Sequence, residues 1–261
     1  MKVSVITTTL NSEKYIRNFL EHLQWADEVV ITDAGSTDKT VDIAKTYGNV
    51  KLYILENCSY SDGFINSFKH SKNEWVLLLG SDEYVSENLA NEIMAVIQST
   101  QFDGFKIPSL IYVLGKWIVD FPCRSRNVRL ARRDKARFIE RRIHESMVVD
   151  GEIGFLSNPY YHFQDNSVSE RLRKLDKYTT LGAIERWNNG QRFSIFNLFY
   201  RPLKYFIWQF IFLKKFTQGV RGLYLAMLKG FYQFIEEMKL YEMEIKVKND
   251  IEGGDKNGIK K

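Results

Sequence analysis

Cysteine is scarce in this chain of 261 residues, where only Cys58 and Cys123 occur. The two lie far apart in the sequence, and neither belongs to the closely spaced pairs that are typical of structural zinc sites. The pattern therefore excludes a cysteine-rich metal centre. We interpret both residues as ordinary thiols of a reducing, cytosolic compartment.

Long hydrophobic runs are also missing. A transmembrane helix needs about 18 or more consecutive apolar residues, and the longest uncharged aromatic and aliphatic run, YFIWQFIFL at residues 205–213, is much shorter. The opening run VSVITTT is too short and too rich in threonine for a signal peptide. We therefore expect a cytoplasmic protein with no membrane-spanning helix.

The remaining composition is that of an ordinary globular protein, with 44% hydrophobic and 26% charged residues. The net charge of +5 and the isoelectric point of about 9.0 suit anionic partners such as phosphates, acidic lipid headgroups or nucleic acid. Charge alone does not choose among these partners.

Apolar and amphipathic segments alternate in the first part of the chain. Strands are predicted at residues 2–6, 28–32, 50–55, 74–79 and 102–107, and helices at residues 12–23, 36–44, 61–70 and 86–98. Such alternation predicts crossover connections and a largely parallel sheet. Ligands of parallel sheets bind beyond the carboxyl ends of the strands, here at residues 7–11, 33–38 and 80–83.

Beyond the fifth predicted strand the pattern changes. Residues 108–162 are irregular and rich in arginine, whereas the chain from Val168 onward is helical and very aromatic. Pro202 and Gly219 are expected to divide the aromatic part into at least two helices. After Glu244 the sequence is polar and contains glycine, which predicts a disordered tail.

Polar clusters follow three of the predicted strands, with the sequences TTTLN, DAGSTD and GSDE. The last cluster places Asp82 and Glu83 just after an apolar run. A carboxylate at the end of an apolar strand is costly unless it is solvated, paired or bound to a cation. Solvated caps and turns would explain any one cluster, but three clusters at one edge of a sheet favour a ligand site.

These stretches resemble the family 2 glycosyltransferases of the GT-A fold, and within them the bacterial lipopolysaccharide-core and cell-envelope branch. The resemblance covers residues 1–165 and is carried by VSVITTTLNSEKYI, ADEVVITDAGSTDKTVDIAKTYG, EWVLLLGSDEYVSENLANEI, GKWI, VRLARRDKARF and IHES. It implies an α/β fold in which a mostly parallel central sheet is flanked by helices. We expect a donor-binding half at residues 1–107, an acceptor and catalytic half at 108–165, a C-terminal helical extension at 166–244 and a disordered tail at 245–261.

The resemblance assigns the donor to residues at the strand ends. Asp33 matches the aspartate that hydrogen-bonds the base, usually uracil, and Asp82 matches the carboxylate that binds Mg²⁺ or Mn²⁺. Gly80 departs from the family motif, which has an aspartate there, and Glu83 or Asp62 is a candidate to supply the missing carboxylate. The other expected donor ligands are Thr7, Thr9, Asn11, Glu13, Gly35 and Ser81, with Arg129 and Arg132 added because guanidinium groups match phosphate geometry.

Catalysis is expected from the second half. Glu145 matches the base that takes the proton of the acceptor hydroxyl, a contribution of about 10² to 10⁴ in rate. His144 would orient the acceptor or touch the metal and diphosphate, and Asp120 is the alternative base. Trp117 is either a platform for an acceptor sugar ring or a core tryptophan, and His162 is either a site residue or a structural one.

Together these residues predict an inverting glycosyltransferase that uses a divalent cation to neutralise the leaving diphosphate. The donor is expected to be a nucleotide-diphospho-sugar, UDP-linked, and the acceptor a hydroxyl of a cell-envelope glycolipid or polysaccharide. The alternative is a non-catalytic or weakened nucleotide-sugar or membrane-surface binding protein of the same fold. Dehydrogenases and cytidylyltransferases are excluded, because no G-x-G-x-x-G and no glycine- and arginine-rich loop follows the first strand.

The aromatic segment leaves two interpretations open. Between residues 193 and 238, bulky apolar residues alternate with lysines and arginines, which is typical of helices that lie in an anionic membrane surface. The same pattern fits a helical cap on the catalytic unit or a dimer interface. For an acceptor carried on a lipid, we expect a peripheral location at the inner face of the cytoplasmic membrane, and no nucleic-acid partner.

Overall fold

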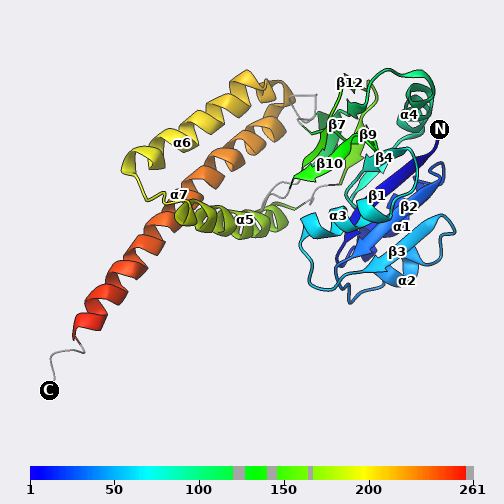
Figure 1. The fold of residues 1–261 in the computed structure, drawn as a ribbon. Helices are drawn as coiled ribbons and strands as arrows, with labels where there is room; N and C mark the ends of the chain where they lie inside the picture. Colours follow the sequence, from blue (N-terminus) through cyan, green and yellow to red (C-terminus); the bar gives the residue numbers. More distant parts are fainter. Residues whose placement is uncertain (120–126, 140–145, 164–166, 257–261) are drawn as a thin grey trace. The chain divides into compact units, whose positions relative to one another are not determined.

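The structure is a computed structural model that describes residues 1–119, 127–139, 146–163 and 167–256. The chain divides into two compact units, which are coloured from blue to green and from yellow-green to red in Figure 1. The first unit comprises Met1–Tyr112 and Trp117–Gln164. The second comprises Val113–Lys116 and Asp165–Lys261.

A seven-stranded sheet forms the centre of the first unit, with the strand order β12-β6-β9-β4-β1-β2-β3. Its strands are β1 (Val3–Thr9), β2 (Glu28–Asp33), β3 (Val50–Ile54), β4 (Trp75–Leu78), β6 (Gly104–Lys106), β9 (Leu130–Arg132) and β12 (Ile153–Phe155). The first four strands are parallel to one another, whereas β9 runs antiparallel to both β4 and β6. The predicted parallel sheet is therefore confirmed, with one strand inserted against its direction.

Four helices flank this sheet: α1 (Glu13–Glu21), α2 (Thr40–Ala44), α3 (Tyr60–His70) and α4 (Glu87–Ser99). Three of them begin within two residues of their predicted starts. The exception is α2, which begins at Thr40 because the preceding polar residues form a turn in which Asp38 Oδ1 accepts from the N–H and Oγ1 of Thr40. The start of α3 is fixed by a capping box between Ser59 and Asp62.

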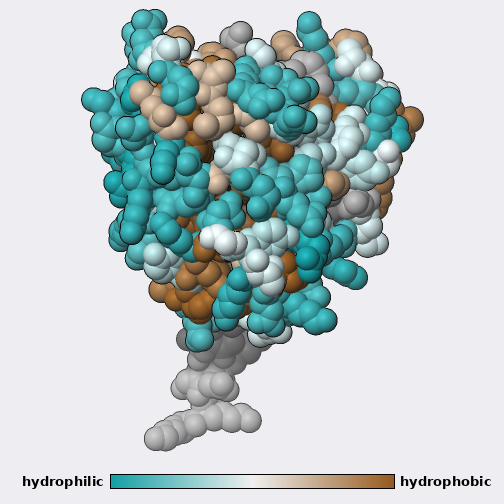
Figure 2. Space-filling model, turned by 90° about the vertical axis from the view of Figure 1, so that its right-hand side faces the viewer, coloured by the Kyte–Doolittle hydropathy of each residue, from teal (hydrophilic) through white to brown (hydrophobic). Residues whose placement is uncertain are grey.

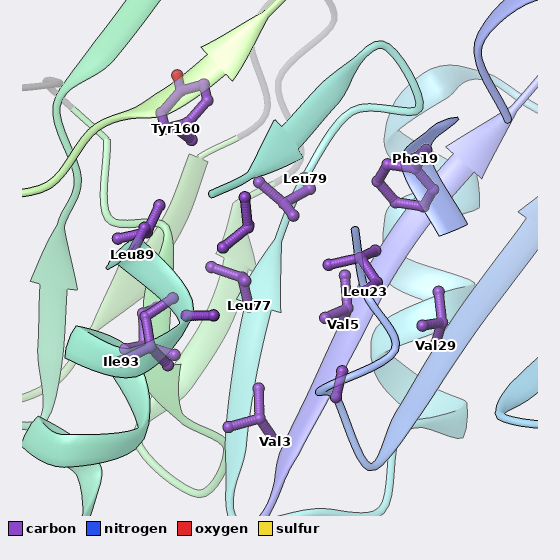
Figure 3. Close-up of a cluster of buried hydrophobic side chains, with 14 of the residues drawn as sticks. Val3, Val5, Phe19, Leu23, Val29, Leu77, Leu79, Leu89, Ile93 and Tyr160 are labelled. Atoms are coloured by element: carbon purple, nitrogen blue, oxygen red, sulfur yellow. The ribbon is translucent and has the colours of Figure 1, made fainter. Parts of the chain in front are cut away.

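Side-chain alternation along the strands divides the core into two layers. On one face, Val3, Val5, Val29 and Leu77 pack with residues of α1, of the turn after it and of α4, as Figure 3 shows for Phe19, Leu23, Leu89 and Ile93. On the other face, Ile6, Val30 and Val76 pack with Phe64 of α3. The helices on both faces leave the ends of the strands as the place where polar loops gather.

The region after residue 107, predicted to be irregular, contains seven short strands among its described residues. Strands of three to five residues show too few alternations to stand out in a sequence. A four-stranded sheet has the order β5-β13-β7-β8 and a two-stranded sheet pairs β10 with β11. The strands of these two sheets are β5 (Glu83–Val85), β7 (Ser109–Val113), β8 (Lys116–Val119), β10 (Ala136–Ile139), β11 (Ser146–Val149) and β13 (Tyr160–His162).

The second unit is helical and consists mainly of α5 (Val168–Asn188), α6 (Ile195–Ile207) and α7 (Gly219–Lys256), with a π-helical turn η1 (Trp208–Phe212) and a 3-10 turn η2 (Lys215–Gln218). Both α5 and α6 pack on α7. The expected break at Gly219 is present, because this glycine has a φ of 61°. The expected break at Pro202 is wrong, because Pro202 lies inside α6 and the packing of α6 on α7 overrides its local preference.

The tail also differs from its prediction, because α7 continues past Glu244 to Lys256. Lys246 pairs with Glu242 one turn earlier at 2.7 Å, and such pairs support a helix. Among the described residues, no helix is both long enough and apolar enough to cross a membrane. The face of the molecule in Figure 2 is mainly hydrophilic, with hydrophobic residues in small separate areas.

The packing of α3 on β1 gives a testable prediction about Gly63. A Cβ at this position would lie 2.4 Å from Cγ2 and 2.5 Å from Oγ1 of Thr8, which is buried in β1. We expect Gly63→Ala to lower the free energy of unfolding by about 1–3 kcal/mol, measured by urea denaturation. Gly48→Ala is the matched control, since a Cβ there meets nothing within 4 Å; equal losses in the two variants would contradict the prediction.

Candidate functional site

Asp33, at the end of β2, organises the first polar loop. Its Oδ1 accepts from the N–H groups of Gly35 and Ser36 at 3.1 and 2.7 Å, and its Oδ2 accepts from Thr9 Oγ1 and Ser36 Oγ at 2.7 and 2.6 Å. Two carboxylate oxygens have about four acceptor sites, so this carboxylate is fully used within the protein. Gly35 allows the turn because its φ is 97°, a conformation that favours glycine.

The loop after β1 is joined to this turn by further hydrogen bonds. Asn11 has a left-handed φ of 49°; its N–H donates to Ser36 Oγ and its Oδ1 accepts from the N–H of Thr37. The N–H of Glu13 donates to Asp38 Oδ2 at 3.0 Å. The two loops therefore form one connected polar edge, as expected for neighbouring parallel strands.

The loop after β4 joins the same edge. Ser81 Oγ lies 3.0 Å from Ser12 Oγ at the start of α1. Thr7, in contrast, is fully buried in β1, and its hydroxyl has no hydrogen-bond partner among the described residues. Of the predicted donor residues on these loops, the structure brings Thr9, Asn11, Asp33, Gly35 and Ser81 together and encloses Thr7 within the sheet.

Glu83 and Arg129 form a buried ion pair behind this edge. Arg129 Nη2 donates to Glu83 Oε1 at 3.0 Å and Nη1 donates to Oε2 at 3.1 Å. Arg129 also donates to the carbonyl of Leu78 and to the hydroxyl of Tyr160. Burial opposes the charge of Arg129, but the Glu83 carboxylate raises the pKa of the guanidinium above its usual value.

This pair changes the roles predicted for both residues. Arg129, expected to bind the diphosphate, is instead committed to Glu83 and to the two neighbouring oxygens. Glu83, a candidate for the missing carboxylate, is 4% exposed and also accepts from the N–H of Gly80 at 2.7 Å. Asp62, the other candidate, serves in the capping box of α3.

Asp82 and His162 form the pair that best fits a metal ion. His162 Nε2 lies 3.1 Å from Asp82 Oδ2, and both side chains are partly exposed. Burial alone would lower the pKa of His162, but its hydrogen bond with Asp82 and the charge of Glu83 raise that pKa above its usual value. Imidazole and carboxylate are donors for a transition metal such as Mn²⁺, whereas Mg²⁺ prefers oxygen ligands.

The remaining ligands of such an ion would have to come from outside the described residues. Within those residues, no group of three or more His, Cys, Asp or Glu side chains is arranged for a metal. A site with few protein ligands is usual for ions that are completed by diphosphate oxygens and water. Asp82 and His162 therefore fit a metal that binds together with a nucleoside diphosphate.

At this edge the sequence left the role of His162 undecided and did not single out Tyr60. His162 was left between a structural and a site role, and its partner Asp82 is 80 residues away; only the pairing of β13 with β5 brings them together. The hydroxyl of Tyr60 lies 3.4 Å from the point where a Cβ at Gly80 would be. Tyr60 and Asp82 thus occupy the space beside Gly80, and no sequence motif signals this.

Other predicted residues lie elsewhere. Arg132 was predicted to bind the donor, but it lies beside the amino end of β4. Because β9 runs antiparallel to β4, Arg132 pairs in register with Trp75. It lies over the ring of Trp75 and 3.7 Å from Asp103, at the opposite end of the strand from Asp82.

Trp117 is half-buried in an aromatic cluster. Its ring centroid lies 5.0 Å from those of both Tyr112 and Tyr161 and 5.1 Å from that of Phe163. Glu13, one of the predicted donor ligands, accepts from the N–H of Lys39. Asp120, His144 and Glu145 lie outside the residues that the structure describes.

The family model described as glycosyl transferase family 2 matches residues 4–216. A lipopolysaccharide core biosynthesis glycosyltransferase, LpsC of Rhizobium meliloti, is 26% identical over 93% of this chain and 93% of its own length. An uncharacterized glycosyltransferase of Rickettsia typhi is 29% identical over 96% of this chain and 90% of its own length.

Among solved structures, S. aureus TarS in complex with UDP-GlcNAc is similar, with a TM-score of 0.53. The match covers 92% of this chain and 89% of that one at 19% identity. At this identity the likeness shows the fold alone.

The buried ion pair gives a prediction about stability. Arg129→Leu would leave Glu83 buried without its partner, and we expect the free energy of unfolding to fall by about 3–5 kcal/mol in urea denaturation. Arg137→Leu is the matched control, because its ion pair with Asp150 is exposed on both sides and such pairs contribute about 1 kcal/mol or less. Similar losses in the two variants would show that the pair at Glu83 has no special role.

Proposed function

The chain belongs to glycosyl transferase family 2 and is a nucleotide-sugar-dependent glycosyltransferase, and we propose that it inverts the anomeric centre while it moves a sugar from a UDP-linked donor to a hydroxyl of a cell-envelope glycolipid or polysaccharide. The predicted family and GT-A fold are confirmed. The proposed acceptor class is supported by LpsC, whose name assigns it to lipopolysaccharide core biosynthesis. The proposed UDP donor is supported by TarS, which was solved with UDP-GlcNAc.

The observation that carries the proposal is the Asp82–His162 pair at the edge organised by Asp33. A fully hydrogen-bonded Asp33 holds the loop of Gly35 and Ser36 in a fixed shape before any ligand arrives. We assign to this loop the nucleoside, and to Asp82 and His162 the divalent cation with the diphosphate. Contact between Asp33 itself and a base would require Ser36 Oγ to leave its position on Oδ2.

A divalent cation, when bound, supplies a Lewis acid for the negative charge that develops on the leaving diphosphate. The protein's own contribution is to hold the two ligands in place. Glu83 lies next to Asp82 in sequence and 3.8 Å from His162 Nδ1. Because Arg129 holds Glu83 in place, the ion pair also positions Asp82 and His162, the two proposed metal ligands.

The catalytic base proposed for the acceptor hydroxyl is Glu145, with His144 beside it and Asp120 as the alternative. These residues lie outside the described part of the chain, and family resemblance alone supports their roles. Trp117 stays the proposed acceptor platform, because its half-buried ring lies in a cluster of other aromatic rings. Stacking on such rings is a common way to bind a sugar.

A second function is favoured by Gly80, which stands where the family motif has an aspartate. With Glu83 committed to Arg129, no described residue replaces that carboxylate directly. A nucleotide-sugar binding protein with weakened transfer would have this arrangement. Turnover of UDP-sugars in the presence of Mn²⁺ separates the two functions, since the weakened protein would bind UDP without releasing it from a sugar.

The proposed metal ligands give a prediction about UDP binding. We expect Mn²⁺ to strengthen UDP binding to the wild-type chain, measured by calorimetry, and Asp82→Asn or His162→Gln to abolish that strengthening while leaving metal-free binding in place. Asp150→Asn is the control, because Asp150 is an exposed residue paired with Arg137. If both site variants keep the full effect of Mn²⁺, the assignment of the metal to this pair is wrong.

The proposed base gives a separate prediction. Glu145→Gln keeps the size of the side chain but removes its ability to accept a proton, so transfer should fall by about 10² to 10⁴ with unchanged affinity for UDP. Transfer is measured as UDP release in the presence of an isolated lipopolysaccharide core acceptor. Loss of UDP affinity in this variant would instead assign Glu145 to donor binding.

A further inference from the structure

The interior of the helical unit contains charged side chains beside buried apolar ones such as Leu225 and Leu240. Arg186 of α5 and Arg201 of α6 both contact Glu236 and Glu237 of α7, at distances between 2.8 and 3.3 Å. Glu237 is fully buried and Glu236 nearly so. Arg201 also donates to Gln233 at 2.6 Å. Two positive and two negative side chains thus form a closed, neutral group where three helices meet.

The outer surface of α6 and η1 is rich in apolar side chains. On α6 and η1, the side chains of Phe196 and Phe199 are 68% and 69% exposed, and Leu203, Ile211 and Phe212 are also exposed by more than half. Residues 196, 199, 203 and 211 recur at helical spacing, so they lie along one face. We call the exposed side chains of α6 and η1 the outer α6 face: Ile195, Phe196, Phe199, Tyr200, Leu203, Trp208, Ile211 and Phe212.

This arrangement is the reverse of that in a helix that packs in water. There the apolar face turns inward and the charged face turns to solvent. Here α6 turns Arg201 inward, beside Pro202 and Phe206, whereas Phe196 and Phe199 turn outward. Exposed apolar surface of this kind is typical of a site of interaction.

The charges around the face identify the kind of partner. Residues 186–235 contain eight lysines and arginines and no aspartate or glutamate. Two of the arginines belong to the internal group, whereas Arg192, Lys204, Lys214 and Lys229 are exposed. A second copy of the chain would bring like charges together over this stretch. An anionic lipid surface would neutralise them.

We propose that the outer α6 face lies in the headgroup region of an anionic bilayer, with Phe196, Phe199 and Phe212 among the acyl chains and Lys204 and Lys214 at lipid phosphates. Tyr200 and Trp208 are residue types that favour this boundary. The role of this membrane contact rests on the proposed function, because an acceptor carried on a lipid is presented at such a surface.

The internal charged group explains how such a unit holds together. When the outer face of a helix is in lipid, the hydrophobic effect no longer distinguishes its inner face from its outer one. Paired charges inside a helix group then specify which sides meet. Arg201 therefore fixes the rotation of α6 that directs Phe196 and Phe199 outward.

The test is sedimentation of the full chain with vesicles of phosphatidylcholine alone and of phosphatidylcholine with phosphatidylglycerol. We expect binding to the anionic vesicles, weakened by salt, and a loss of about tenfold or more in the partition coefficient for Phe196→Ser with Phe199→Ser. Lys204→Glu with Lys214→Glu should remove the preference for phosphatidylglycerol. The matched control is Ile54→Ser with Leu55→Ser, two apolar residues that are exposed on the first unit.

UDP binding is measured on the same variants, which separates this inference from the proposed function. Retained UDP affinity with lost vesicle binding supports the outer α6 face as the lipid contact. Absence of vesicle binding by the wild-type chain, or equal binding by wild type and Phe196→Ser with Phe199→Ser, would overturn it. A dimer in light scattering that dissociates in that variant, without vesicle binding, would assign the face to a second copy instead.

Discussion

The ion pair between Glu83 and Arg129 joins the two larger sheets of the first unit. Glu83 begins β5 in the four-stranded sheet, whereas Arg129 directly precedes β9 in the central sheet. Buried charges stabilise a protein only when hydrogen bonds complete them, and here Gly80, Leu78 and Tyr160 do so. The positions of Asp82 and His162 depend on this pair, because each adjoins Glu83 in sequence or in space.

The ion pair also changes how the glycine at position 80 is interpreted. The family motif that this chain resembles has an aspartate at this position. A Cβ on Gly80 would lie 2.9 Å from Asp82 Oδ1 and 3.5 Å from the carboxyl carbon of Glu83. The space that an aspartate would need is therefore already taken by two carboxylates and by Tyr60. Gly80 therefore fits its surroundings, because a larger side chain there would have to displace the Asp82 carboxylate.

The sequence predicted what depends on local pattern and missed what depends on pairing between distant segments. The first four strands and the polar edge beside Asp33 follow from apolar runs that end in turn residues. The Asp82–His162 pair and the displacement of Arg132 depend on β13 and β9, which are too short to be recognised and whose directions no periodicity reveals. In the aromatic segment, the alternation of apolar and basic residues left a membrane surface, a helical cap and a dimer interface open. It could not tell that Arg201 would pair with Glu236 and Glu237 of α7.

The closed charge group of the helical unit has a consequence for folding. Arg186, Arg201 and the two glutamates come from three different helices, and α7 with only one of the other two helices would hold two glutamates beside a single arginine. Partly assembled forms are therefore penalised more than either the separate helices or the complete unit. This difference in free energy makes assembly cooperative, so the three helices fold and unfold together.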